Sequence, residues 1–104
     1  MLFRSNSLAI LSGVADNAAE LCEKIAAGEF LDCTLSMKCF KYDALLLTDR
    51  EKWQGRVVDE IRSEYKVMLD SGATSVWETA EGAPAFRNAG SLCHGWSAIP
   101  ILYL

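Results

Sequence analysis

A stripe of apolar residues at helical spacing runs through the middle of the chain and limits its fold more than any other feature. The residues of this stripe are Trp53, Val57, Val58, Ile61, Tyr65, Met68 and Leu69. Apolar residues at this spacing lie on one face of an amphipathic helix. Thr48 and Glu51 have the spacing of a capping box at its start, and Gly72 is expected to end it.

Two further helices are predicted before this one. Asp16 is expected to cap a helix that runs through about Ala27, with Gly28 beyond its end. Its inward face would consist of Ala18, Ala19, Cys22, Ile25 and Ala26. Ser36 is expected to cap a second helix. The inward residues of that helix would be Met37, Phe40, Ala44 and Leu47.

The last part of the chain changes character. Residues 73–77 favour an extended segment, and residues 86–90 are predicted to form a loop. Ser91 is expected to cap a final helix, which Pro100 would end or kink. The sequence therefore predicts an all-α fold of about four helices, with a short extended segment and a loop before the last helix.

Length and composition indicate one small domain rather than a disordered tail. The chain has 104 residues, and 51% of them are hydrophobic, which is enough apolar material to bury a core. The formal charge of −4 argues against a nucleic-acid or anionic-membrane partner, because both need clustered Lys and Arg. No apolar run has the length of a membrane span, and the first residues do not resemble a signal peptide. A cytoplasmic location is expected for the chain as written, and that of a longer parent stays open.

The four cysteines are expected to be buried free thiols. They are Cys22, Cys33, Cys39 and Cys93, and no pair has the CxxC spacing of a zinc site. The sequence therefore predicts neither a metal nor another cofactor. Three of the four have an apolar neighbour, which favours burial over disulfides.

The final segment is apolar on nearly every side. Its apolar residues are Leu92, Cys93, Trp96, Ala98, Ile99, Ile101, Leu102, Tyr103 and Leu104. A helix of this kind is normally surrounded by protein, and a chain this short offers few surroundings. The isolated chain is therefore expected to self-associate or to be poorly soluble.

An acidic residue beside a tryptophan is the first candidate for chemistry. Glu78 follows Trp77, while His94 and Trp96 come shortly afterwards in a glycine-flanked segment. Indole faces pack on pyranose rings, and carboxylates and imidazoles bind hydroxyl groups, so these residues suit a sugar site. Other interpretations stay open: Glu78 as a surface carboxylate, the two tryptophans as core residues, and His94 as a core or helix-start histidine.

Two segments together resemble the C-terminal signature of bacterial α-L-rhamnosidase-like enzymes, which have a six-hairpin (α/α)6 barrel. They are residues 72–79, GATSVWET, and residues 90–98, GSLCHGWSA. Residues 7–13 and 34–38 resemble helix-entry segments of the same barrel, so the resemblance covers nearly the whole chain. It implies that residues 1–104 are the C-terminal hairpins of a partial barrel.

The resemblance implies a fragment of an inverting glycoside hydrolase. Glu78 would be the general base and would activate the water that attacks the anomeric carbon from the face opposite the leaving group. His94 would bind sugar hydroxyls, and Trp77 and Trp96 would wall the subsite. Nothing in the chain corresponds to the family's general acid, so the chain alone is expected to hydrolyse glycosides poorly or not at all.

A second function stays open. The chain could be a non-catalytic helical module that self-associates through its apolar faces. The expected partners are a carbohydrate substrate if the barrel is complete, and a second copy or the missing part of the barrel otherwise. Ser75 and Val76 depart mildly from the threonine and larger apolar residue common in the family, at the expected floor of the subsite. The sugar and linkage stay open, because relatives of this fold act on several sugars.

Overall fold

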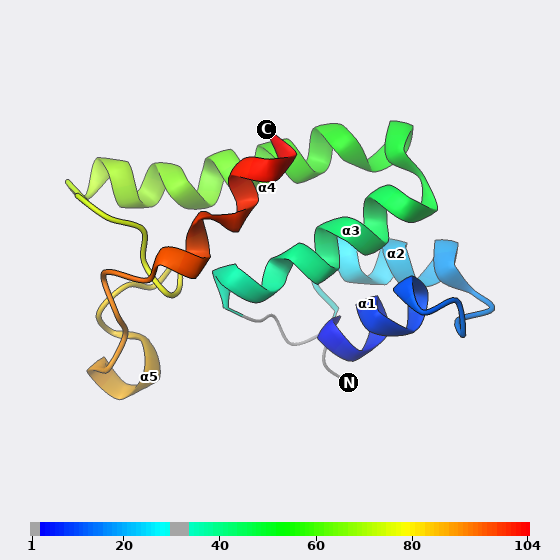
Figure 1. Ribbon diagram of the computed structural model, residues 1–104, viewed down its shortest axis with the longest axis horizontal. Helices are drawn as coiled ribbons and strands as arrows, with labels where there is room; N and C mark the ends of the chain where they lie inside the picture. Colours follow the sequence, from blue (N-terminus) through cyan, green and yellow to red (C-terminus); the bar gives the residue numbers. More distant parts are fainter. Residues whose placement is uncertain (1–2, 30–33) are drawn as a thin grey trace. The chain divides into compact units, whose positions relative to one another are not determined.

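Helices form the regular structure of residues 3–29 and 34–104, which are the residues that the computed structural model describes. In chain order the elements are α1 (Phe3–Leu11), α2 (Ala18–Ala26), the 3-10 helix η1 (Leu35–Met37), α3 (Lys38–Thr48), α4 (Arg50–Asp70), α5 (Ala85–Asn88) and the 3-10 helix η2 (Gly95–Tyr103), as Figure 1 shows. These ranges contain no strand, so the predicted all-α class is confirmed. Across the same ranges, no helix combines the length and the apolar character that crossing a membrane requires.

The chain divides into two compact units. The first unit consists of residues 1–33 and 37–56, and the second of residues 34–36 and 57–104. In the first unit α3 contacts both α1 and α2, so it is the central helix there. Helix α4 belongs to both units, because the boundary falls directly after Arg56.

Glycine ends three of the helices through one hydrogen-bond pattern. At the end of α4, the Gly72 amide donates to the carbonyl of Leu69, and the next amide donates to that of Met68, both at 3.0 Å. This is a Schellman motif, in which glycine readily takes the left-handed conformation. Gly13 and Gly28 end α1 and α2 in the same way, and the φ angles of the three glycines lie between 74° and 80°. The predicted ends at Gly28 and Gly72 are therefore confirmed.

The predicted starts of α2 and α3 are wrong. Helix α2 begins after Asn17 rather than after Asp16, and no side chain caps it. Ser36 does not cap α3, because it lies inside η1 and is buried there. The 3-10 turn η1 leads directly into α3, so the α-helix begins only at Lys38.

The start of α4 is displaced by one residue from the predicted capping box. The Asp49 carboxylate accepts the amide of Lys52 at 3.1 Å, which makes Asp49 the capping residue. Thr48 is not available for this role, because its hydroxyl donates to the Ala44 carbonyl at 2.9 Å in the preceding helix. Thr48 is the last residue of α3, and Asp49, with an extended backbone, separates the two helices.

Helix α3 buries a face that shares only Ala44 with the predicted one. Its buried residues are Lys38, Lys41, Tyr42, Ala44 and Leu45, whereas Leu47 is 66% exposed. Positions 38, 41, 42 and 45 also recur at helical spacing, so the sequence offers two possible inward faces. The aliphatic stems of lysines can be buried while their ammonium groups reach a partner, and both lysines have one.

Helix α4 confirms the predicted stripe over most of its length. Trp53, Val57, Ile61 and Met68 are buried, while Leu69 at the end of the stripe is 73% exposed. The stripe spans the boundary between the units, so this one apolar face supplies core residues to both of them.

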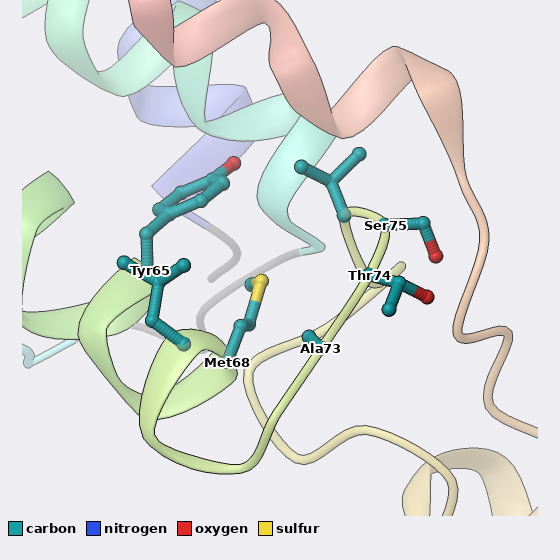
Figure 2. A pocket seen from close by; sticks show the side chains of 7 residues that line it. Tyr65, Met68, Ala73, Thr74 and Ser75 are labelled. Atoms are coloured by element: carbon teal, nitrogen blue, oxygen red, sulfur yellow. The ribbon is translucent and has the colours of Figure 1, made fainter.

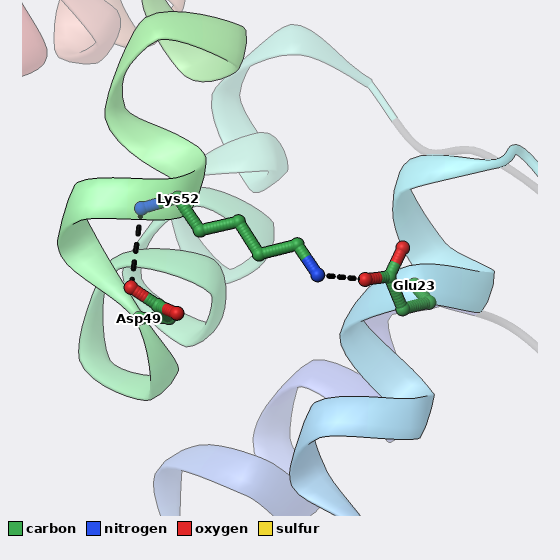
Figure 3. A network of polar contacts seen from close by, with 3 residues as sticks. All are labelled: Glu23, Asp49 and Lys52. Carbon is green, nitrogen blue, oxygen red and sulfur yellow. Dashed lines mark hydrogen bonds and ion pairs between the residues drawn. The ribbon is translucent and has the colours of Figure 1, made fainter.

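Two basic side chains one turn apart on α4 hold α2 within the first unit. The Lys52 ammonium pairs with the Glu23 carboxylate, as Figure 3 shows. The Arg56 guanidinium donates to the carbonyl of Ala26, the last residue of α2. A cation at this end of a helix satisfies a free carbonyl and opposes the negative end of the helix dipole.

The last quarter differs from its predicted structure in two respects. The final helix is a 3-10 helix that starts after His94, so Ser91 does not cap it, and Pro100 lies inside it. A single turn of helix, α5, occupies most of the predicted 86–90 loop. Residues 73–77 lie outside the helices, as predicted for an extended segment, and they form no strand.

The cysteines are only partly buried. Cys22 is buried and Cys39 half-buried, whereas Cys93 is exposed, so the prediction of burial is wrong for Cys93. These three are free thiols, and Cys33 lies outside the described residues. Cys93 lies in the irregular segment before η2, where its amide donates to the Ser91 hydroxyl at 3.3 Å.

Candidate functional site

The segments before and after the 79–90 loop lie side by side in the second unit. The Glu78 amide donates to the Ser91 carbonyl, and the His94 amide donates to the Val76 carbonyl, each at 2.9 Å. These bonds join antiparallel segments in the manner of a short ladder. Residues that the sequence analysis selected from two separate motifs are therefore brought next to each other through their backbones.

The carboxylate of Glu78 is held on one side only. Its Oε2 atom accepts the Ser91 amide at 3.3 Å, while Oε1 accepts no hydrogen bond from any residue that the structure describes. The backbone of Glu78 is fixed as well, because its carbonyl accepts the Leu35 amide at 3.3 Å. The side chain is half-buried, so one oxygen is held and the other can meet a small polar molecule.

Trp77 packs its ring against the loop. A Cβ atom at Gly82 would lie 3.0 Å from two carbon atoms of the Trp77 ring, so the ring lies directly against this glycine. Gly82 has a φ of 71°, and its missing side chain leaves the space that the indole occupies. Trp77 is half-buried, so it has both a packing role and an accessible part.

His94 and Trp96 differ in their surroundings. His94 is half-buried and immediately precedes η2, where its backbone pairing fixes its position. Trp96 lies in the first turn of η2 and is 57% exposed. The backbone pairing therefore brings the segment of Trp77 and Glu78 next to that of His94, and it does not extend to Trp96.

A buried hydroxyl beside Glu78 was not selected from the sequence. The Oγ1 atom of Thr79 is buried and has no hydrogen-bond partner in the described part of the chain. Leaving such a group unpaired costs about 1–3 kcal/mol, which a water or a ligand hydroxyl can offset. The position of Thr79 directly after Glu78 in the sequence is the signal that could have identified this residue.

An apolar pocket of about 290 Å³ lies close to the paired segments but does not contain the selected residues. It is lined by Tyr65, Met68, Leu69, Ala73, Thr74, Ser75 and Val76. In Figure 2 Tyr65 and Met68 reach toward the pocket from α4, and the hydroxyls of Thr74 and Ser75 point away from Tyr65. The pocket therefore offers apolar surface, and the groups suited to sugar chemistry lie outside it.

Comparison of the chain with protein-family models, with curated proteins and with solved structures finds no match. The rhamnosidase-like resemblance therefore stays a prediction that rests on residues 72–79 and 90–98. Within residues 3–29 and 34–104, no group of three or more His, Cys, Asp or Glu side chains could hold a metal ion.

Proposed function

We propose that the chain contributes the general base and part of the sugar subsite of an inverting glycoside hydrolase of the α-L-rhamnosidase-like type. The observation that carries this proposal is the backbone pairing of Glu78 with Ser91 and of Val76 with His94. It joins the two segments on which the resemblance rests, and it does so without using the side chains that would contact a sugar.

The environment of Glu78 is compatible with general-base chemistry. A general base must accept a proton from water while its position stays fixed. Oε2 is held by an amide, which leaves Oε1 as the oxygen that takes the proton.

The general acid would come from residues outside this chain. Inverting enzymes place the two carboxyl groups roughly 6.5–9.5 Å apart, with the attacking water between the sugar and the base. Without the acid the leaving group is not protonated, so the chain alone would be a poor catalyst. The substrate class is a glycoside, with an α-L-rhamnoside as the first choice.

The test is to read the coding sequence upstream of Met1 and to assay the longer protein on aryl α-L-rhamnosides. Glu78→Gln is expected to lower kcat by roughly 10²–10⁴-fold, because the amide cannot accept the proton. Glu81→Gln is the matched control, since Glu81 is exposed and lies in the same segment. Near wild-type activity in Glu78→Gln would remove this residue from the mechanism.

The alternative function is a helical module that self-associates. It is favoured by the exposure of the apolar C-terminal residues, since Ile101 is 71%, Leu102 79% and Leu104 68% exposed. Apolar groups gathered in this way commonly mark an interaction surface. A monomer in light scattering, unchanged over a range of concentrations, would contradict this alternative.

A further inference from the structure

Gly90 occupies a position where a side chain cannot be accommodated. A Cβ atom at this residue would meet the carbonyl oxygen of Gly82 closer than real Cβ contacts ever lie, and would be 3.1 Å from the Cβ of Ala85. The obstructing oxygen belongs to the backbone and already accepts the Ala85 amide at 3.2 Å. Gly90 is itself tied to the loop, because its amide donates to the Ala83 carbonyl at 3.3 Å.

The next residue holds the carboxylate of Glu78. The Ser91 amide donates to Oε2 of Glu78 at 3.3 Å, and the Ser91 carbonyl accepts the Glu78 amide at 2.9 Å. The amide in question belongs to the peptide group that joins Gly90 to Ser91. A side chain on Gly90 would therefore displace the donor, and a bond that is already at the long end of the normal range would be lost.

We propose that Gly90 is a positioning residue for Glu78, because its missing side chain lets the Ser91 amide reach the carboxylate. This inference rests on the proposed function for the role of Glu78 as a base. The amide fixes Oε2 and so orients Oε1 toward the attacking water. The hydrogen bond itself can be measured on the chain without any catalytic assay.

The measurement is the pH dependence of the Ser91 amide proton shift in the ¹⁵N-labelled chain. An amide bonded to a carboxylate changes its shift when that carboxylate is protonated, and Glu78→Gln is expected to abolish the change. Gly90→Ala is expected to abolish it too. Gly95→Ala is the matched control, because a Cβ there meets nothing within 4 Å, and it is expected to leave the titration unchanged.

The inference is overturned if the Ser91 amide shift titrates equally in Gly90→Ala. It is also overturned if the wild-type titration is absent, or if it survives Glu78→Gln and disappears in Glu81→Gln. These last comparisons test the hydrogen bond from Ser91 to Glu78, on which the inference depends, even where Gly90→Ala does not fold. Failure of the proposed function is a different result, in which Glu78→Gln leaves glycoside hydrolysis intact while the Ser91 titration is still observed.

Discussion

At the scale of single residues, the candidate site is built by backbone groups around a few side chains. Amides hold Glu78 and His94 in place, and glycines at positions 82 and 90 make room for the indole and for the close approach of the loop ends. Main-chain contacts of this kind fix the candidate side chains and leave Oε1 of Glu78 without a partner among the described residues. Substitution of the glycines should therefore disturb the site as strongly as substitution of the acidic residue.

The cysteines provide a residue-scale prediction. Burial raises the pKa of the Cys22 thiol, so the folded chain keeps this thiol neutral, whereas Cys93 is exposed. Iodoacetamide at neutral pH is expected to alkylate Cys93 before Cys39 and Cys22, as measured by mass spectrometry of the peptides. Equal rates at Cys93 and Cys22 would contradict the buried position of Cys22.

The sign of the pH effect follows from the same shift. Because the folded-state pKa of Cys22 is raised above the unfolded value, its contribution to stability is complete below the unfolded pKa. That contribution is lost as the pH rises through the folded pKa. Alkaline solution should therefore both weaken the fold and expose this thiol to the reagent.

At the scale of elements, glycines inside and beyond helix α4 should respond in opposite ways to the same substitution. Gly55 lies within α4, and a Cβ there meets nothing within 4 Å, so Gly55→Ala is expected to raise the free energy of unfolding by about 0.5–1 kcal/mol. Gly72→Ala is expected to lower it by about 1–2 kcal/mol, because Gly72 has a φ of 76°. Urea denaturation followed by circular dichroism measures both changes, and a common sign would contradict the assigned backbone conformations.

Helix ends were more predictable than helix starts. Gly28 and Gly72 leave little choice, because the left-handed conformation strongly favours glycine. At the starts, Asp16 competes with Asn17 and Thr48 with Asp49, and such neighbours differ by only a few tenths of a kcal/mol as caps. The packing between helices then decides which of the two residues begins the helix.

The inward face of α3 and the backbone pairing at the site could not be predicted from the sequence, because both depend on tertiary contacts. The sequence contains two helical stripes on α3, and the buried one includes Lys38 and Lys41, each of which has a partner. The bonds between residues 76–78 and 91–94 depend on how the intervening loop closes. The motifs selected Trp77, Glu78 and His94 as candidates, whereas the contacts of Ser91 and Gly90 are tertiary and left no periodic signal.

At the scale of the whole molecule, the exposed apolar C-terminal residues are expected to control association. Leu102→Glu should lower the average mass measured by light scattering, because it places a charge on the most exposed of them. Val14→Glu is the matched control, since Val14 is 73% exposed but lies in the first unit away from this cluster in sequence. An equal effect of both substitutions would indicate general solubility rather than a specific surface.

Helix α4 contributes residues to both units, and this limits where the chain can be divided into separately expressed fragments. A cut after Arg56 would divide α4 and leave new helix ends whose amides and carbonyls have lost their partners. Neither half could then be produced with its full set of secondary-structure elements. The melting of one half is thermodynamically linked to that of the other, because continuing an existing helix is far easier than starting a new one.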